Sequence, residues 1–364
     1  MNKRLAFLSI VILSGILLAA CGSAAESNVE PANEAAPNNT TDTEISTDTT
    51  EDPITVVQII NGTLGDKSFN DLANSGLTQA SIDFGFSFDT IEAGSDPAKW
   101  EPAFVDAVQN PDVDFIVLGA SDLLDILIEY APMYPDKKFI MFDHTIPFDE
   151  GDYSNVYAVQ YQQNVGSYLA GLYAGLMSQT GIIGAVGGMD IPVINDFMVG
   201  YIQGACDAGI PEENILIQYG NGFFDPAKGK ELALTEYQQG ADIIFQVAGG
   251  TGEGVFYAAE ETGNWAIGVD SDQATVLEET HPELSARILT SMQKKVDKSL
   301  YLAFQRYFEG TLPFGTNEPL GIPNGVGLTY NKYYEENTPQ EVKDKITEAE
   351  TAILNGSIVV ESVF

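Results

Sequence analysis

Two aspartates stand at the ends of matched apolar segments and are the first candidates for a binding site. Asp143 ends the segment Phe139–Asp143, and Asp270 ends the segment Trp265–Asp270. Each segment is short and continuously apolar, as expected of a strand buried in a parallel sheet. In open α/β sheets, ligands bind outside the carboxyl ends of the strands. The two carboxylates therefore indicate hydrogen-bond acceptors in a site that two similar lobes share.

The loop Asn61–Asp71 carries a second group of candidate side chains. It follows the first apolar strand, Ile54–Ile60, and so lies at the mouth of the sheet. Ser68 and Asp71 suit the cap of the helix that follows. Capping does not explain Phe69, whose ring in the first turn can face the cleft. The alternative is that this ring packs into its own lobe.

The glycine-rich segment Gly249–Gly254 lies between a strand and a helix. It lacks the glycine spacing of a dinucleotide-binding loop. We interpret it as a place where the backbone, at Gly250, comes close to a small ligand. A simple turn at the start of the helix is the alternative.

The sequence offers no constellation of residues for catalysis. Its two histidines, His144 and His281, are too few and too scattered for a metal cluster. Neither a Gly-x-Ser-x-Gly elbow nor a Gly-x-x-x-x-Gly-Lys-Ser/Thr phosphate loop occurs. We therefore expect a protein that is not an enzyme and that uses no metal or cofactor. His144, directly after Asp143, either contacts a ligand or faces solvent.

A repeated Asp-Pro-Ala-Lys word, at Asp96–Lys99 and Asp225–Lys228, suggests that the fold is duplicated. In each copy we expect the aspartate to cap a helix that has proline at its first position. Strands lie at similar distances before and after the two copies. The paired strands are Ile54–Ile60 with Ile182–Val186, Val113–Leu118 with Ala241–Gln246, and the two segments that end in Asp143 and Asp270.

Strands alternate with amphipathic stretches from residue 54 to about residue 270, which predicts an α/β fold with parallel sheets covered by helices. Two lobes of ordinary size fit the folded part. We place the first lobe at 53–160 plus about 289–320, and the second at 161–288 plus about 321–364. The part from Ile288 onwards has no evident counterpart in the repeat, and we expect it to form the hinge. Helices are expected near 68–84, from 97, and near 122–134, 164–179, 194–208, 226–239, 253–262, 296–309 and 339–354, with a further strand near 325–329.

The N-terminal residues 1–20 read as a secretion signal, since Lys3 and Arg4 precede an apolar run too short for an ordinary membrane span. The run ends in Leu18-Ala-Ala-Cys21, the form of a bacterial lipobox, so we expect a lipid on Cys21. A plain signal peptide with an incidental cysteine is the alternative. Residues 21–52 contain no lysine or arginine and predict a disordered acidic linker.

Cysteine and charge counts bound the possible partners. Cys206 is the only other cysteine, so lipidation of Cys21 leaves no intrachain disulfide. We expect Cys206 to be buried on a helix. Without the signal, 14 of the 16 basic residues remain against 53 acidic ones, a formal charge of −39. This excess of acid argues against a nucleic acid polymer as a partner.

Six segments together resemble the basic-membrane-protein (BMP) family of ABC-transporter substrate-binding lipoproteins. The resemblance runs in order through essentially the whole folded region. It implies a type I periplasmic-binding-protein fold, in which two Rossmann-like lobes are joined by three crossovers. Characterised members bind purine nucleosides and deliver them to a membrane permease. The segments are the lipobox, Gly65–Asn70, Phe223–Gly229, Val247–Gly252, Gly268–Gln273 and Leu289–Lys294.

The resemblance also implies roles for individual residues at the nucleobase. It places Phe69 and Phe223 on the two faces of the base, where each stacked ring contributes about 1–3 kcal/mol. Asn61 and Asn70 would hydrogen-bond polar atoms of the ligand. Asp143 would read the base edge or close the cleft.

At the ribose, the resemblance assigns a carboxylate and a lysine. Asp270 matches the acceptor of the ribose hydroxyls, and Lys294 matches the lysine beside it, which would offset the cost of enclosing that carboxylate. The chain departs from the family in two places. Asn61 stands where members often carry aspartate, and Phe224 adds a second ring beside Phe223.

The expected protein is a monomeric, lipid-anchored receptor on the extracytoplasmic face of the cell membrane. It would close on a purine nucleoside by a hinge motion and pass the ligand to an ABC permease. Two alternatives remain open at this point: a binding protein for a sugar or sugar-like signal, and a sensory surface lipoprotein without a transport role.

Overall fold

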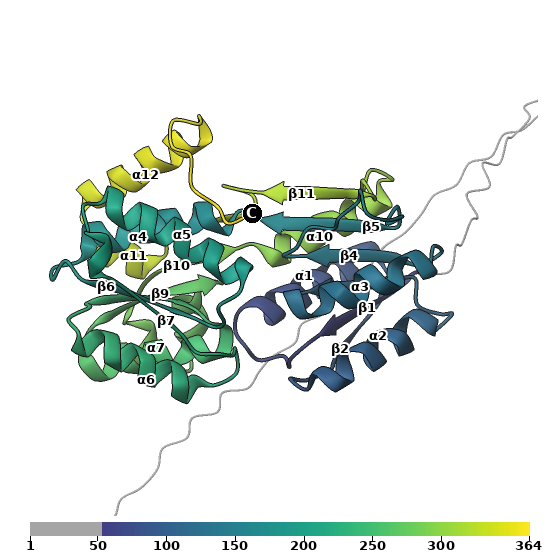
Figure 1. Cartoon of the computed structure of the whole chain (residues 1–364), viewed down its shortest axis with the longest axis horizontal. Helices are drawn as coiled ribbons and strands as arrows, with labels where there is room; N and C mark the ends of the chain where they lie inside the picture. Colours follow the sequence, from purple (N-terminus) through teal and green to yellow (C-terminus); the bar gives the residue numbers. More distant parts are fainter. Residues whose placement is uncertain (1–52) are drawn as a thin grey trace, which may run out of the picture. The chain divides into compact units, whose positions relative to one another are not determined.

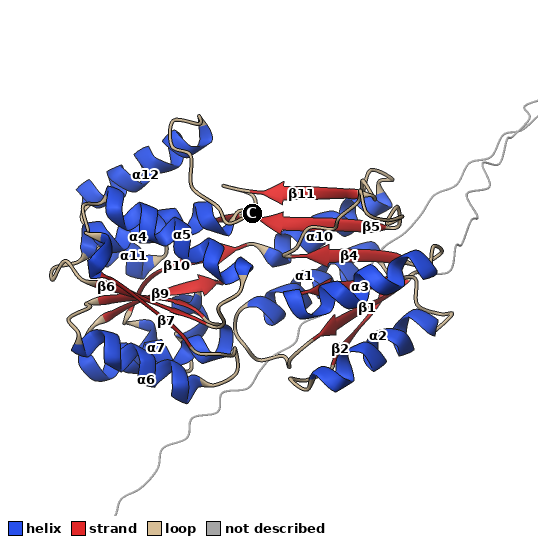
Figure 2. Ribbon diagram, viewed as in Figure 1, coloured by secondary structure: helices blue, strands red, loops and turns tan. Residues whose placement is uncertain are grey.

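A computed structural model describes residues 53–364. The predicted signal peptide, the lipidation site at Cys21 and the linker lie outside the described residues. The described part of the chain contains two six-stranded sheets (Figures 1 and 2). We call each sheet with the helices that cover it a lobe. No helix within residues 53–364 is long and apolar enough to span a bilayer.

The first sheet has the strand order β11-β5-β4-β3-β1-β2, and all of its strand pairs are parallel. Its central strands are mostly apolar and buried along nearly their whole length, as the sequence predicts for a sheet covered on both faces. The strands are β1 (Thr55–Ile60), β2 (Ser87–Glu92), β3 (Phe115–Gly119), β4 (Lys138–Phe142), β5 (Val156–Tyr161) and β11 (Thr316–Leu320).

The second sheet has the order β12-β10-β9-β8-β6-β7, which repeats the order of the first. Its pairs are parallel except for β10 with β12, which run antiparallel. The strands are β6 (Ile183–Gly187), β7 (Ile215–Tyr219), β8 (Ile243–Val247), β9 (Trp265–Asp270), β10 (Ile288–Lys294) and β12 (Val326–Leu328).

Helices cover both faces of the sheets. In the second lobe, α6 and α7 lie on one face of the sheet and α4 and α5 on the other (Figure 1). In the first lobe, α1 packs against α10. The helices are α1 (Phe69–Phe84), α2 (Trp100–Gln109), α3 (Leu124–Tyr130), α4 (Gln163–Met177), α5 (Pro192–Asp207), α6 (Pro226–Gln238), α7 (Gly249–Thr262), α8 (Gln273–Leu277), α9 (Pro282–Ser285), α10 (Val296–Phe308), α11 (Lys332–Asn337) and α12 (Gln340–Leu354).

The chain crosses between the lobes three times: from β5 to α4, from β10 to α10, and from β11 to β12. The expectation that residues from Ile288 onwards have no counterpart in the repeat is wrong, because β10 and β12 occupy the positions of β5 and β11. The return to the first lobe comes after Lys294 and not near residue 289, since β10 pairs with β9. The sequence did not reveal this correspondence because β11 is a short, polar edge strand without a buried apolar run.

The fold confirms the predicted helix caps and contradicts the predicted burial of Cys206. Asp96 and Asp225 cap their helices, because their side chains accept hydrogen bonds from the backbone N–H of Ala98 and Lys228. Cys206, in contrast, is exposed and not buried. It lies in the last turn of α5, on the face turned away from α4 and the sheet.

A fully buried carboxyl lies beneath the second sheet. Glu236 of α6 accepts a hydrogen bond from Gln218 Nε2 through Oε1 at 3.2 Å. Its Oε2 has no hydrogen-bond partner among the described residues. Burial raises the pKa of Glu236 to about 9, so the folded protein keeps this group protonated at neutral pH.

Candidate functional site

One cavity of about 550 Å³ lies between the lobes, at the carboxyl ends of strands from both sheets. The arrows of β4, β5 and β11 run towards the second lobe in Figure 2. A volume of this size suits a small organic ligand. The cavity brings together every residue that the sequence nominated for ligand binding: Asn61, Phe69, Asn70, Asp143, Phe223, Gly250, Asp270 and Lys294.

The loop before α1 is shaped by carboxylates, but not in the way the sequence predicted. Ser68 is the residue before the helix, yet its side chain makes no capping hydrogen bond. Asp66 does this instead, because its two oxygens accept from the backbone N–H groups of Ser68, Asn70 and Asp71. These three bonds hold the turn that presents Phe69 and Asn70 to the cavity. Burial nevertheless raises the pKa of Asp66.

The hydroxyl of Ser68 is free for a different partner. Ser68 Oγ donates to Asp270 Oδ2 at 2.5 Å, which joins the first lobe to the second. Asp270 ends β9 with a positive φ of 62°, a conformation that aspartate tolerates better than most side chains. Burial raises the pKa of Asp270 to about 6, although Lys294 and Ser68 both act to lower it.

Lys294 pairs with the other strand-end aspartate. Its Nζ lies 2.6 Å from Asp143 Oδ1, and both side chains are buried. This ion pair also crosses between the lobes, from the end of β10 to the end of β4. The resemblance placed Lys294 beside Asp270, and its charge does lower the pKa of Asp270, but the hydrogen-bonded partner of Lys294 is Asp143. The ammonium group also lies 4.7 Å from the ring centroid of Phe197.

The aromatic side chains reach the cavity from opposite lobes. Phe69 packs against Phe142, with ring centroids 5.1 Å apart. Phe223 lies against Gly188, where an added Cβ would stand 2.1 Å from the ring. Phe224, half exposed, lies against Gly62 of the first lobe in the same way, at 2.6 Å. Both phenylalanines line the cavity.

Gly250 lies in the first turn of α7. A Cβ at Gly250 would stand 3.1 Å from the carbonyl oxygen of Phe223, so the glycine permits close backbone packing at the cavity wall. The helix begins at Gly249, earlier than the sequence predicted. The segment starts a helix, and Gly249 and Gly250 line the cavity; a close approach of this backbone to a ligand stays a prediction.

Polar side chains at the first-lobe end of the cavity form two hydrogen-bonded pairs that the sequence did not predict. Asn61 Nδ2 donates to Asp122 Oδ2 at 2.8 Å. Ser121 Oγ lies 2.8 Å from His144 Nε2. Partial burial lowers the pKa of His144. Ser121 and Asp122 follow the end of β3, so the strand-end rule that nominated Asp143 could also have found them.

The remaining unanticipated side chains are mostly apolar and cover the second-lobe wall. They come from the start of α5 and the loop before it, which the sequence marked only as the beginning of a helix. Trp100 adds an aromatic ring from the first lobe, with its Nε1 bonded to the Gly94 carbonyl at 2.7 Å. The apolar residues are Met189, Ile191, Val193, Ile194 and Phe197.

This arrangement can bind a ligand that combines a flat apolar part with polar groups. Aromatic and aliphatic side chains supply apolar surface, while Asp143, Asp270, Asn61 and Asn70 supply hydrogen-bond partners. The polar contacts come from both lobes, so a ligand that engages them bridges the cleft. No cluster of three or more His, Cys, Asp or Glu side chains within residues 53–364 has metal-site geometry.

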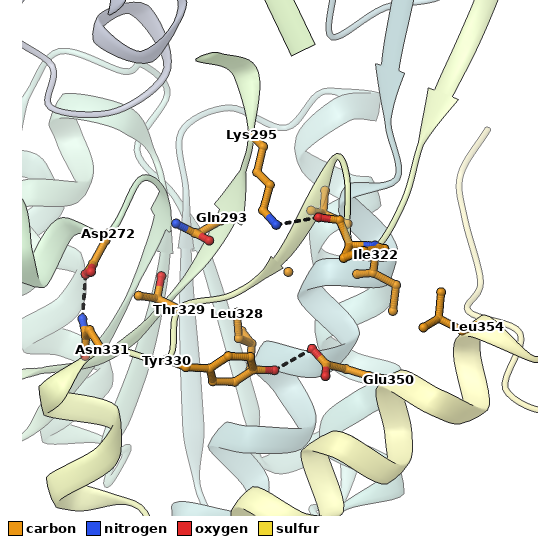
Figure 3. Close-up of a pocket in the computed structure, with 13 residues that line it drawn as sticks. Asp272, Gln293, Lys295, Ile322, Leu328, Thr329, Tyr330, Asn331, Glu350 and Leu354 are labelled. Atoms are coloured by element: carbon orange, nitrogen blue, oxygen red, sulfur yellow. Dashed lines mark hydrogen bonds between the residues drawn. The ribbon is translucent and has the colours of Figure 1, made fainter. Parts of the chain in front are cut away.

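A second hollow of about 470 Å³ lies beside the crossovers, on the β12 edge of the second lobe (Figure 3). Lys295 donates to the carbonyl of Pro323 at 2.5 Å there, which ties two crossovers together. Tyr330 donates to Glu350, and Asn331 to Asp272. The hollow contains none of the residues nominated from the sequence.

Comparison with known proteins agrees with this architecture. The family model described as "ABC transporter substrate-binding protein PnrA-like" matches residues 54–362. A relative from Listeria innocua, named CD4+ T-cell-stimulating antigen, is 31% identical over 97% of this chain and 96% of its own. The ABC transporter nucleoside-binding protein BmpA of Lactococcus lactis is 30% identical over 84% of this chain and 88% of its own.

A solved structure extends the comparison to the fold. An ABC transporter solute-binding protein from Aeropyrum pernix superposes with a TM-score of 0.74 at 27% identity, covering 84% of this chain and 93% of its own. The two lobes with mostly parallel sheets are those of the type I solute-binding fold. The chain therefore belongs to the Bmp family of PnrA-like ABC transporter substrate-binding proteins.

Proposed function

We propose that this protein binds a purine nucleoside between its lobes and delivers it to the permease of an ABC importer. The proposal includes a lipid anchor on Cys21 that holds the receptor at the extracytoplasmic face of the cell membrane. The observation that carries it is the convergence of Phe69 and Phe223, from opposite lobes, on the cavity that Asp270 also lines. The name of the Lactococcus relative, a nucleoside-binding protein, points in the same direction.

The chemistry of the cavity matches the two halves of a nucleoside. Stacking on aromatic rings is tolerant of base identity and supplies about 1–3 kcal/mol per ring. A carboxylate with two acceptor oxygens suits the vicinal hydroxyls of ribose, and Asp270 uses only Oδ2 for Ser68. Asn61 and Asp122 line the cavity, and their amide and carboxylate groups are suitable hydrogen-bond partners for a base edge.

Isothermal titration calorimetry with adenosine, guanosine, inosine, uridine and ribose tests the ligand class. We expect heat from the purine nucleosides and none from ribose alone. Binding of ribose without nucleosides would support a sugar receptor instead. Absence of heat from every compound, with the protein folded, would contradict the proposal. Thermal denaturation adds a second readout, since a ligand at 100 times its Kd stabilises by about 2.7 kcal/mol.

Two substitutions test the site. Phe69→Ala should weaken purine nucleoside binding roughly 5- to 150-fold, the equivalent of about 1–3 kcal/mol of stacking. Asp270→Ala should weaken it by a similar amount because a charged acceptor is lost. Asp83→Asn is the matched control, because Asp83 is a first-lobe carboxylate outside the cavity that accepts a hydrogen bond from Tyr301. Unchanged affinity in both site variants would remove the assignment.

Delivery to a permease is tested separately from binding. In cells that lack other uptake routes, loss of this protein should abolish import of radiolabelled nucleoside, and Cys21→Ser should release the receptor from the membrane. Normal import without the protein would favour the sensory alternative.

A further inference from the structure

Lys67 joins the lobes although its side chain does not line the cavity. Its Nζ lies 2.8 Å from Glu253 Oε1 on α7 of the second lobe. Its carbonyl oxygen accepts a hydrogen bond from Ser271 Oγ at 2.8 Å, directly after β9. We call Lys67, Glu253 and Ser271 the latch. Ser68, the next residue, adds its hydrogen bond to Asp270, so this one short turn makes three hydrogen bonds to the second lobe.

The first lobe holds this turn in a fixed shape. Lys67 has a φ of 51°, a left-handed conformation that lysine rarely adopts. Asp71 stabilises it by accepting from the backbone N–H groups of Gly65 and Lys67 at 2.7 and 2.8 Å. Asp66 fixes the residues that follow. The turn therefore presents the ammonium group and the carbonyl of Lys67 in a preorganised position, so little ordering cost remains when the lobes meet.

The latch ion pair differs from a typical surface pair. The Lys67 and Glu253 side chains are 34% and 19% exposed, so solvent screens the pair only in part. Its two residues lie in different lobes, Lys67 in the loop before α1 and Glu253 on α7. The pair can form only when the lobes are together. A contact that exists in one of two states shifts the equilibrium towards that state.

We propose that Lys67 is a positioning residue that holds the lobes closed through Glu253 and Ser271, and so sets how long a bound ligand stays in the cleft. The latch acts on closure and touches no ligand. The part of the inference that concerns ligand residence rests on the proposed function, whereas the part that concerns closure does not.

The first experiment measures ligand dissociation by stopped-flow fluorescence, with Trp100 at the cavity wall as the intrinsic probe. Lys67→Met should release a purine nucleoside roughly 2- to 5-fold faster than the wild type, the effect expected of one partly exposed ion pair. Lys228→Met is the matched control. Lys228 is also 34% exposed and paired with a glutamate, Glu231, but within one helix. It should leave the rate unchanged.

Reversal of charge separates a specific pair from a general loss of structure. Lys67→Glu should accelerate dissociation further, and addition of Glu253→Lys should restore a rate close to that of the wild type. Raising the salt concentration should accelerate dissociation from the wild type more than from Lys67→Met, because only the wild type has the pair to screen. Failure of the reversed pair to restore the rate overturns the proposal.

The second experiment needs no ligand. Spin labels on Cys206 of the second lobe and on the cysteine of an Asp106→Cys variant in the first lobe report their separation by double electron–electron resonance, in a full-length Cys21→Ser background. Lys67→Met should shift the ligand-free distance distribution away from that of the wild type, and Lys228→Met should not. An unchanged distribution in Lys67→Met overturns the latch. If no nucleoside binds the wild type, the proposed function fails, and these distances still decide whether the latch exists.

Discussion

The ion pair between Asp143 and Lys294 allows a quantitative test of how the cleft is stabilised. The two groups lie 2.6 Å apart and are only 8% and 2% exposed, so neither charge has bulk water as a substitute partner. Removing one member of a buried pair strands the other charge and typically costs about 3–5 kcal/mol. We therefore expect Lys294→Met to reduce the free energy of unfolding by about 3 kcal/mol or more. We expect a loss at the lower end of this range because water can enter the cleft once the lysine side chain is removed.

Removing both charges should cost less than the sum of the single changes. Asp143→Asn alone removes the hydrogen-bonded carboxylate from the ammonium group of Lys294, which keeps the more distant Asp270 and its aromatic neighbours, with Phe197 nearest at 4.7 Å. The double variant Asp143→Asn/Lys294→Met leaves neither member of this pair as an unpaired charge, and Asp270 keeps its hydrogen bond from Ser68. Its loss should stay below about 2 kcal/mol, since replacing a buried pair by neutral groups is often nearly neutral. The coupling energy between the two positions should then exceed about 2 kcal/mol.

Urea denaturation followed by far-UV circular dichroism measures these losses, with the two single variants and the double variant compared with the wild type at pH 7. Additive losses, or a single Lys294→Met variant as stable as the wild type, would refute the reasoning.

Two buried carboxyl groups and the adjacent rings of Phe223 and Phe224 offer further tests of the site and core. Because the pKa of Asp270 is about 6, nucleoside affinity should fall roughly tenfold between pH 7 and pH 5 as the acceptor becomes protonated, and calorimetry on Asp270→Asn should show no such dependence. Glu236 keeps its proton when folded but loses it near pH 4.5 when unfolded, so wild-type stability falls as pH rises from about 4.5 to 9. Glu236→Gln should therefore stabilise the protein by about 3 kcal/mol at pH 7 in urea titrations, with no gain near pH 4.5. Phe223→Ala should weaken nucleoside binding more than Phe224→Ala, since Phe224 is the more exposed ring, and the reverse order would exchange their roles.

Strand ends could be predicted from the sequence because their signal is local. Continuous apolar runs identify buried parallel strands, and polar residues that follow them must gather at one edge of the sheet. This rule nominated Asp143 and Asp270, and both line the cavity. It could not reveal β11, a polar edge strand that pairs with β5 across more than 150 residues of chain. Edge strands bury one side only and carry little apolar pattern.

Hydrogen-bond partners were harder to predict than positions. Ser68 has the residue type of a helix cap, and only the shape of the turn explains why Asp66 takes that role. A left-handed Lys67 places the Asp66 carboxylate below the first free N–H groups of α1 and leaves the Ser68 hydroxyl facing the second lobe. Backbone conformation of this kind depends on the hydrogen bonds that Asp66 and Asp71 accept within the turn, and the residue types alone do not specify them.

The duplicated fold explains why the two matched aspartates differ in chemistry. Asp143 and Asp270 follow equivalent strands and share a left-handed backbone, with φ of 71° and 62°. The next strand in each sheet ends differently, in Tyr161 of β5 and in Lys294 of β10. One lysine therefore faces two carboxylates, and it bonds to Asp143 in the opposite lobe.

Because Lys294 bonds to Asp143, Asp270 has the hydroxyl of Ser68 as its hydrogen-bond partner. The pKa of Asp270 is raised, because the more distant lysine only partly offsets the effect of burial. A buried acceptor that lacks a direct cationic partner gains most from new hydrogen-bond donors. Asp143, already neutralised by its ion pair, gains less. The asymmetry favours Asp270 as the anchor for ligand hydroxyls and assigns Asp143 mainly to holding Lys294 and the two lobes together.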